Sequence, residues 1–235
     1  MNSNAVKDAS APPVAEPKQD KLRARLLSAL VMAPPVLAAI YFGEPFFDIL
    51  VAIAVLIMAW EWNRLCSGRW IWLVAGGLFI LLPSTALIWL RADPEFGRQT
   101  VLWLFAVVWA MDSGAFAFGK LIGGPKLLAS VSPKKTWAGL IGGIACAGAV
   151  GAATAAVVGN KDMAPLAAFS AATGAVSQGG DLAESWVKRH FSVKDTSNII
   201  PGHGGLLDRV DGLMAAAAAA ALITLAGGGS ILSWL

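Results

Sequence analysis

The fold is decided by an uninterrupted apolar stretch at residues 70–90, which reads WIWLVAGGLFILLPSTALIWL and contains no charged side chain. A membrane-spanning α-helix needs about 20 apolar residues to cross a hydrocarbon core of about 30 Å. Six further stretches of similar character can be drawn along the chain. They are residues 26–42, 46–62, 100–119, 137–158, 163–180 and 213–234.

The composition points to the same fold class. Of the 235 residues, 57% are hydrophobic and 14% are charged, whereas a soluble domain carries about 25% charged residues. We therefore predict an all-α, polytopic integral membrane bundle of about seven transmembrane helices, within a range of six to nine. Pro83 offers an alternative in which residues 70–90 form two shorter helices, which gives eight segments. The net charge of +3 is too small to indicate a nucleic-acid partner.

The basic residues predict the orientation of the chain. With the N-terminus in the cytoplasm, 15 of the 18 lysines and arginines fall on the cytoplasmic side, and only Arg91, Arg98 and Lys161 fall outside. Cytoplasmic loops of membrane proteins carry such an excess. We expect an integral protein of a bacterial inner (plasma) membrane, with its N-terminus and its active site in the cytoplasm.

Two regions follow from this organisation. Residues 1–25 are rich in Ala, Pro, Lys and Asp, which predicts a disordered cytoplasmic tail without a cleavable signal peptide. Residues 26–235 are predicted to form a single transmembrane catalytic domain, in which residues 112–212 carry the active site at the cytoplasmic face. The last four predicted spans are rich in glycine and alanine, which allows helices to approach closely in lipid.

The first candidate site residues directly follow the predicted span 163–180. Asp181, Ser185 and Lys188 follow one another at spacings of four and three residues, so they share one face of a helix. A carboxylate, a hydroxyl and an ammonium group on one face suit a metal ion and a phosphate held side by side. A solvated helix end with an ordinary Asp–Lys contact is the simpler alternative.

A glycine-rich loop and two aspartates follow. Pro201, Gly202, Gly204 and Gly205 predict a loop whose backbone can approach a ligand and whose N–H groups can bind phosphate. Asp208 and Asp211 lie three residues apart before the last predicted span. Carboxylates of this kind suit Mg²⁺, which usually binds through one or two of them together with substrate phosphates.

These residues carry a resemblance to a known family. The string Ser185-x-x-Lys188-Arg189, followed by Lys194-Asp195 and by Pro201-x-His203-Gly204-Gly205-x-x-Asp208-Arg209-x-Asp211, resembles the signature of phosphatidate cytidylyltransferases, also called CDP-diacylglycerol synthases. An upstream block is similar to a second region of that family; it comprises Asp112-Ser113-Gly114-Ala115-Phe116, Phe118-Gly119-Lys120, Ser132-Pro133-Lys134-Lys135-Thr136-Trp137 and Gly142-Gly143. Two positions depart from the pattern, since Ala138 replaces a common Glu and Phe116 replaces a common Tyr.

The resemblance implies conversion of CTP and phosphatidate into CDP-diacylglycerol and pyrophosphate, in phospholipid biosynthesis. Mg²⁺ or Mn²⁺ is the expected cofactor, a monovalent cation is a further candidate, and a homodimer is the candidate assembly. A phosphate monoester has a second pKa near about 6, so phosphatidate arrives as a ready nucleophile and requires no strong general base.

The candidate residues can be grouped by role. Asp208, Asp181 and Lys188 are the catalytic candidates. The metal ligands are expected to be Asp181 and Asp208, with Asp211 as a third ligand or a supporting group. The substrate-binding candidates are Ser185, Arg189, His203, Gly204, Gly205, Arg209, Lys134, Lys135 and Asp112.

Four of these candidates have alternative interpretations. His203 is a phosphate or loop-ordering contact, with proton transfer as its alternative. Asp112 lies within the span 100–119, where it either lines a polar cavity or stays hydrated near the interface. Lys134 and Lys135 bind substrate phosphates or, alternatively, anionic lipid headgroups.

Other functions remain open at this point. The nearest is a related CTP-dependent membrane transferase that acts on another lipid phosphate or a lipid alcohol. A transporter would bind its substrate near the membrane midplane and often shows internal repeats, and neither feature is present in the sequence. A CDP-alcohol phosphotransferase fits poorly, because Asp211-Gly212 runs directly into an apolar, alanine-rich stretch.

Overall fold

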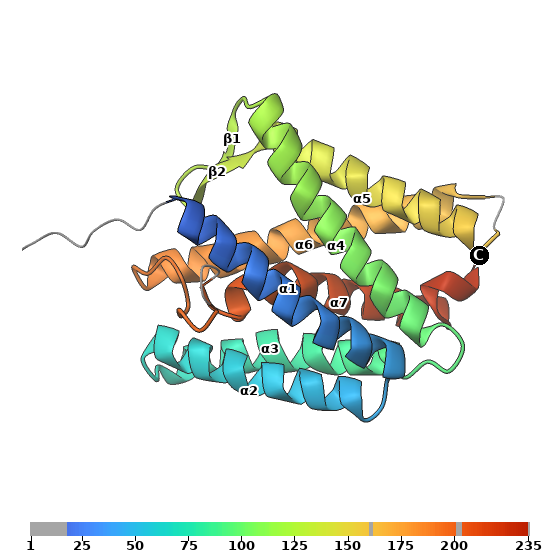
Figure 1. The fold of residues 1–235 in the computed structure, drawn as a ribbon, viewed down its shortest axis with the longest axis horizontal. Helices are drawn as coiled ribbons and strands as arrows, with labels where there is room; N and C mark the ends of the chain where they lie inside the picture. Colours follow the sequence, from blue (N-terminus) through green and yellow to red (C-terminus); the bar gives the residue numbers. More distant parts are fainter. Residues whose placement is uncertain (1–17, 160–161, 201–203, 235) are drawn as a thin grey trace, which may run out of the picture.

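The computed structural model describes residues 18–159, 162–200 and 204–234. It is a bundle of long α-helices with one β-hairpin (Figure 1). The helices are α1 (Lys18–Phe42), α2 (Phe46–Cys66), α3 (Trp70–Arg91), α4 (Gly97–Leu121), α5 (Trp137–Val157), α6 (Ala164–His190) and α7 (Leu207–Gly227). The hairpin consists of β1 (Lys126–Leu128) and β2 (Ser132–Thr136), and a 3-10 helix, η1 (Ile231–Trp234), closes the described chain.

The predicted all-α membrane bundle agrees with this architecture, but the count of seven spans is not confirmed. In the described part of the chain, five helices are long and apolar enough to cross a membrane, namely α2, α3, α4, α5 and α7. In the described part of α1, Leu30–Phe42 forms a shorter apolar segment. The helix α6 is not among these five: its first part contains Ser170, Thr173, Ser177 and Gln178, and its last turns carry several charged residues.

Several boundaries differ from the prediction. The helix α1 begins at Lys18, inside the predicted tail, and residues 1–17 lie outside the described residues. The helix α3 runs without interruption through Pro83, so the 70–90 stretch does not split into two helices. The last helix begins at residue 207 instead of 213 and ends at Gly228, whose φ of 73° is the left-handed conformation that commonly ends a helix.

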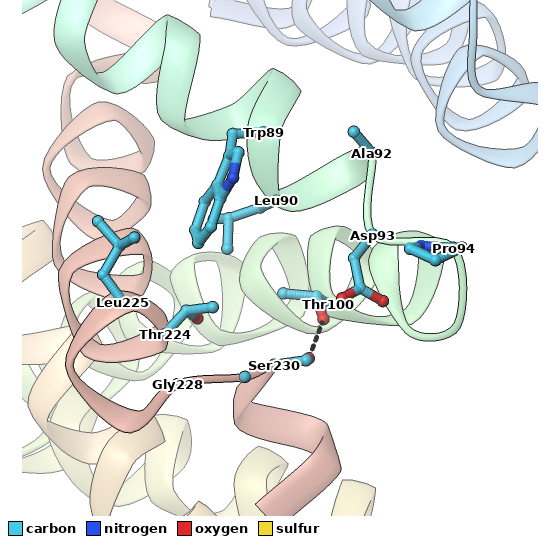
Figure 2. Close-up of a pocket in the computed structure, with 11 residues that line it drawn as sticks. Trp89, Leu90, Ala92, Asp93, Pro94, Thr100, Thr224, Leu225, Gly228 and Ser230 are labelled. Atoms are coloured by element: carbon cyan, nitrogen blue, oxygen red, sulfur yellow. Dashed lines mark hydrogen bonds between the residues drawn. The ribbon is translucent and has the colours of Figure 1, made fainter.

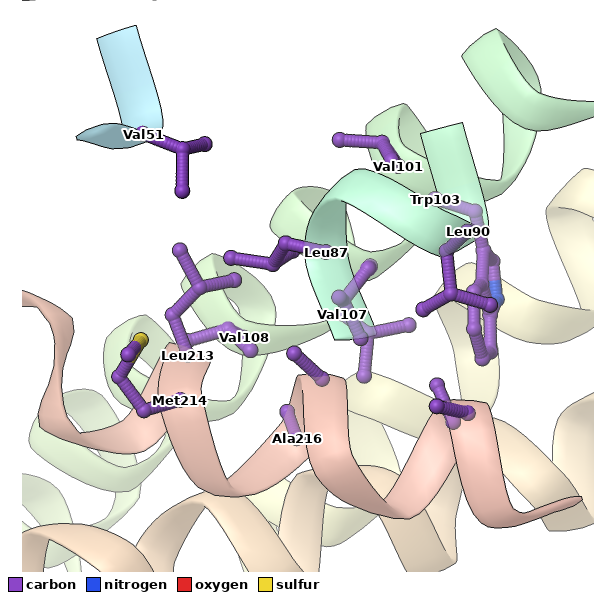
Figure 3. Close-up of a cluster of buried hydrophobic side chains, with 14 of the residues drawn as sticks. Val51, Leu87, Leu90, Val101, Trp103, Val107, Val108, Leu213, Met214 and Ala216 are labelled. Atoms are coloured by element: carbon purple, nitrogen blue, oxygen red, sulfur yellow. The ribbon is translucent and has the colours of Figure 1, made fainter. Parts of the chain in front are cut away.

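The core lies where α4 and α7 meet α2 and α3. Figure 3 shows Val107 and Val108 of α4 beside Leu87 of α3 and Leu213 of α7. All four side chains are buried. One polar contact crosses the core, where the indole Nε1 of Trp103 donates a hydrogen bond of 2.9 Å to Ser170 Oγ.

Small residues let the later helices approach closely, as predicted. A Cβ added to Gly143 of α5 would lie 2.7 Å from the carbonyl oxygen of Met111 in α4. A Cβ added to Gly180 of α6 would lie 2.5 Å from the Cβ of Ala215 in α7. Because neither position has room for a larger residue, α4, α5, α6 and α7 form one tightly packed unit.

The polar connections gather at one end of the bundle. The α2–α3 turn, the hairpin and the connection between α6 and α7 all lie at the left of Figure 1, and the C-terminus lies at the opposite end. The hairpin was not predicted. It is anchored at both sides, because Trp137 N donates to Pro125 O at 3.1 Å and Thr136 Oγ1 accepts from Gly139 N at 3.1 Å.

Candidate active site

The C-terminal end of α6 presents the first pair of predicted residues. Ser185 Oγ donates a hydrogen bond of 3.3 Å to Asp181 Oδ1. The other carboxylate oxygen of Asp181 lies 2.7 Å from Lys135 Nζ, which extends from β2. The hairpin and α6 are therefore joined by an ion pair, and two blocks of sequence that are 46 residues apart (135 and 181) meet at one carboxylate.

Lys188 also belongs to α6, but its side chain forms no hydrogen bond or ion pair with Asp181 or Ser185 and binds two other acids. Its Nζ lies 2.5 Å from Glu184 Oε2 and 2.7 Å from Asp208 Oδ1. The lysine is only 8% exposed, and Glu184 is 1% exposed. One buried ammonium group thus lies between two carboxylates, and it links α6 to the first turn of α7.

Asp208 is held by an unusually complete set of donors. Its Oδ2 accepts hydrogen bonds from Gly205 N at 2.9 Å, from Thr196 N at 3.0 Å and from Thr196 Oγ1 at 3.1 Å. Its Oδ1 accepts from Lys188 Nζ at 2.7 Å. Hydrogen bonds to a charged group are roughly twice as strong as neutral ones, so the position of this carboxylate is firmly fixed.

Two glycines of the predicted loop, Gly204 and Gly205, pack beside Asp208. Gly204 has a φ of 87° and pairs with Ile200 in an isolated antiparallel bridge. A Cβ added to Gly205 would lie 2.0 Å from Thr196 Oγ1. Both glycines therefore let the backbone close around Asp208. Pro201, Gly202 and His203 lie outside the described residues, so the predictions for them stay predictions.

A second acidic group lies beside Asp181. Asp211 is 8% exposed, and its Oδ1 accepts a hydrogen bond of 2.8 Å from Gly212 N. The charge of Asp181 acts on Asp211 and also on Asp112 of α4. Lys135 and Arg209 lie within electrostatic range of Asp112. Three predicted aspartates thus belong to one electrostatic cluster that Lys135 enters from the hairpin.

The remaining predicted basic residues, Arg189, Lys134 and Arg209, differ in their contacts and exposure. The guanidinium of Arg189 donates to Val131 O at 3.3 Å and to Val193 O at 3.1 Å, so it ties the hairpin to the connection after α6. Lys134 is exposed, and Arg209 is exposed on the first turn of α7. Lys134 and Arg209 are therefore accessible to a ligand.

The structure adds four residues that were not predicted: Glu61, Glu184, Thr196 and Ser197. The Glu61 carboxylate, from α2, contacts both Thr196 and Ser197 through their hydroxyl groups. A signal for it existed, because an acidic residue inside an apolar segment is costly and often functional. No local pattern indicates its partners, which lie about 135 residues later in the chain.

Two cavities border this cluster and share a wall. The first, of about 720 Å³, is polar and is lined by Arg64, Leu65, Ser67, Arg69, His190, Phe191, Ser192, Val193, Lys194, Asp195, Thr196, Ser197 and Asn198. The second, of about 430 Å³, is almost entirely apolar. Its lining comes mainly from α2 and α7, with further residues from α1, α3 and α4. The residues Ile199, Ile200, Leu206, Arg209 and Val210 form its side toward the cluster.

A third cavity, of about 390 Å³, lies at the opposite end of the bundle (Figure 2). Figure 2 shows Trp89 and Leu225 beside the hydroxyl pair Thr100–Ser230, whose oxygens are 3.1 Å apart. Among the described residues that line it, Asp93 is the only charged one. Because the described lining residues offer no cation, this cavity suits a phosphorylated ligand less well than the cluster around Asp208 does.

Comparisons with known proteins identify the family of the chain. Residues 70–226 match the sequence model of the cytidylyltransferase family. The chain is 36% identical to the phosphatidate cytidylyltransferase of Brucella suis biovar 1 (strain 1330), over 83% of this chain and 90% of that protein. It is 35% identical to the Rickettsia bellii (strain RML369-C) protein of the same name, over 84% and 88%. It is 32% identical to that of Haemophilus influenzae (strain ATCC 51907 / DSM 11121 / KW20 / Rd), over 83% and 96%.

Proposed function

This chain belongs to the cytidylyltransferase family, and we propose that it uses the cluster around Asp208 to convert CTP and phosphatidate into CDP-diacylglycerol and pyrophosphate. A phosphate oxygen of phosphatidate bonds to the α-phosphorus of CTP, and the bond from that phosphorus to the β-phosphate bridge breaks. Pyrophosphate leaves with the electron pair. The product stays in the bilayer, and the pyrophosphate enters the aqueous phase.

The shared wall between the two cavities is the observation that carries this proposal. Residues 194–198 line the polar cavity, and residues 199, 200, 206, 209 and 210 line the apolar one. Asp208 contacts Thr196, which lines the polar cavity, and Lys188 contacts Asp208. An enzyme that joins a water-soluble nucleotide to a lipid needs such an arrangement, because each substrate requires surroundings of its own polarity and the reacting atoms must meet.

The polar cavity fits the nucleotide. Arg64, Arg69 and Lys194 line it, and none of the three forms an ion pair within residues 18–159, 162–200 and 204–234. A concave surface with an excess of one charge concentrates ligands of the opposite charge. The triphosphate of CTP is such a ligand, and this cavity supports its placement beside residues 194–198.

The apolar groove fits an acyl chain of phosphatidate. Its lining includes Ala54 and Met58 of α2 together with Leu213 of α7, and Arg209 is its one charged residue. A lipid with an anionic headgroup would place its chains along the apolar walls and its phosphate at the guanidinium. The phosphate would then lie at the junction between the groove and the acidic cluster.

The lysines supply positive charge where the transferring phosphates carry negative charge. Transfer of this kind depends mainly on alignment and on electrostatic stabilisation. Lys135 and Lys188 lie at opposite sides of the cluster, and each approaches a carboxylate to 2.7 Å. In the proposed complex Lys135 contacts substrate phosphate, and Lys188 keeps Asp208 ionised and oriented.

The expected Mg²⁺ fits part of the predicted ligand set. No group of three metal-ligating side chains close enough to hold an ion occurs among the described residues. Asp208 is engaged by Lys188 and by the loop, and Asp181 pairs with Lys135 and interacts electrostatically with Asp211. Once Lys135 contacts substrate phosphate, as proposed above, Asp181 and Asp211 become available as a pair of carboxylates. These two aspartates would hold the ion together with substrate phosphates. When bound, Mg²⁺ would neutralise charge on the CTP phosphates.

The placement in the membrane is part of the proposal. The α2–α3 turn, the hairpin and the α6–α7 connection lie at one end of the bundle and carry most of the loop lysines and arginines, which supports a cytoplasmic position for that end. The bacterial relatives support the inner membrane. The homodimer expected from the sequence stays a prediction that a mass measurement in detergent would test.

The decisive experiment is an assay of the purified full chain in detergent–lipid micelles, with CTP, phosphatidate and Mg²⁺ or Mn²⁺. We expect equal amounts of pyrophosphate and CDP-diacylglycerol. A panel of lipid phosphates and lipid alcohols separates the related transferases. The variant Asp208→Ala should insert into the membrane and lack turnover. Pyrophosphate release that required another acceptor, or full activity of Asp208→Ala, would contradict the proposal.

A further inference from the structure

Glu61 is a fully buried carboxylate on α2. It has 0% exposure and lies near the C-terminal end of that helix, outside residues 70–226 that match the family model. Burying an ionised carboxylate is costly unless hydrogen bonds compensate it. The hydrogen-bond donors around Glu61 therefore indicate which part of the structure it stabilises.

Four donors surround this carboxylate: three belong to the connection between α6 and α7, and the fourth is the backbone N–H of Leu207, the first residue of α7. Ser197 Oγ donates to Oε1 at 2.5 Å, and Thr196 Oγ1 donates to Oε2 at 3.4 Å. At the other end of the connection, Leu206 N donates to Oε1 at 2.9 Å and Leu207 N donates to Oε2 at 2.7 Å. Glu61 thus joins the beginning and the end of one loop.

The two backbone donors belong to the start of α7. A helix leaves its first N–H groups without intrahelical partners, and a negative charge at that end is favourable. In most helices a residue next to the helix supplies the cap. Here the cap comes from α2, about 145 residues earlier in the chain. The start of α7, and with it Asp208, is therefore placed by a separate helix.

Glu61 and Asp208 also hold the same residue from two sides. Thr196 Oγ1 lies 3.4 Å from the Glu61 carboxylate and 3.1 Å from Asp208 Oδ2. Gly205 closes the space between them, because an added Cβ would lie 2.7 Å from Glu61 Oε1. Movement of the Glu61 carboxylate would therefore move the donors that orient Asp208.

We propose that Glu61 is a positioning residue for the transfer reaction: its carboxylate fixes the α6–α7 connection and thereby orients Asp208 at the wall between the two cavities. This inference rests on the proposed function. The location of Glu61 agrees with this role. Met58, one turn before it, lines the apolar groove, and Arg64, one turn after it, lines the polar cavity.

The variant Glu61→Gln gives a sharp test, because its shape is almost unchanged. Each carboxylate oxygen accepts one backbone N–H, so either orientation of the amide places an NH₂ donor against an N–H donor. We expect kcat to fall about 10- to 100-fold. The KM values for CTP and for phosphatidate should change less than about threefold, because neither substrate is expected to contact Glu61.

Hydrogen–deuterium exchange supplies a readout that does not depend on activity. In Glu61→Gln, amides of residues 204–210 should exchange at least about tenfold faster, whereas those of α5 should keep the wild-type rate. Asp48→Asn removes a carboxylate from the other end of the same helix and serves as the matched control. It should keep wild-type kcat and wild-type exchange.

The outcomes separate this inference from the proposed function. Wild-type protein without cytidylyltransferase activity would refute the function, whatever the exchange data show. An active wild type whose Glu61→Gln variant keeps kcat within twofold, or exchanges faster throughout the molecule, would overturn the positioning role. If that variant does not fold, Ser197→Ala removes one donor only. A kcat about 3- to 10-fold lower is then expected, and an unchanged kcat would overturn the inference.

Discussion

Replacing Lys188 by methionine tests the central ion-pair network, because methionine keeps the length of the side chain and removes its charge. Lys188 Nζ lies 2.5 Å from Glu184 and 2.7 Å from Asp208. The side chains of the two acids are 0% and 3% exposed. Solvent therefore screens neither ion pair appreciably.

The expected loss of stability follows from this burial. Removing one partner of a buried ion pair costs about 3–5 kcal/mol, because an uncompensated charge stays buried. Lys188→Met leaves two carboxylates without their shared cation, so we expect a loss of at least about 3 kcal/mol in the free energy of unfolding. Turnover should fall by about 10²-fold or more, since Asp208 loses the donor that orients it.

Reversible unfolding in mixed micelles, followed by tryptophan fluorescence, measures the free energy. Lys135→Met is the matched control, because the Lys135 and Asp181 side chains are 19% and 33% exposed and their pair is expected to contribute about 1 kcal/mol or less. Adding Glu184→Gln to Lys188→Met should restore about 1–2 kcal/mol, as coupled neighbours do. Equal losses for the two lysine variants would refute the reasoning.

Three further predictions concern the cavities and the loop. Ala54→Trp places a large side chain in the apolar groove. In steady-state assays it should raise KM for long-chain phosphatidate about tenfold and leave KM for a short-chain analogue unchanged. Ala52 is exposed on the same helix, so Ala52→Trp should change neither KM value. Arg69→Gln should raise KM for CTP about fivefold, and a similar rise for Arg98→Gln at the opposite end would contradict the assignment of the polar cavity. Gly205→Ala puts a methyl group 2.0 Å from a side-chain oxygen, so both kcat and the melting temperature should fall, and wild-type values would show that the loop adapts.

Local patterns predicted the parts of the site that depend on one helix. The spacing of Asp181 and Ser185 correctly placed both on one face, because helical periodicity fixes that relation. The same spacing did not reveal that Lys188 turns to Glu184 and Asp208. A long, flexible side chain chooses among several carboxylates, and that choice depends on how α6 packs against α7.

Contacts between segments that are far apart in the chain could not be predicted from the sequence. The hairpin was predicted as a loop, since its strands are short and Pro133 interrupts β propensity. Its register depends on the ends of α4 and α5. Glu61 was missed for a similar reason, because its four donors come from residues 196–207 and no periodic pattern connects them to α2. An acid within an apolar segment was the available signal.

The described residues of the wall, 194–200 and 204–210, line two different cavities, so the preferences for the two substrates can be changed separately. Side chains at 194–198 meet only the polar cavity, whereas those at 199, 200 and 210 meet only the apolar groove. A library that varies the groove-facing residues of α2 and α7 would therefore retune fatty-acyl length and leave nucleotide recognition intact. Variation of the α2–α3 turn would do the converse. Substitutions that adapt the protein to a different membrane lipid and substitutions that change nucleotide recognition would then fall on different residues.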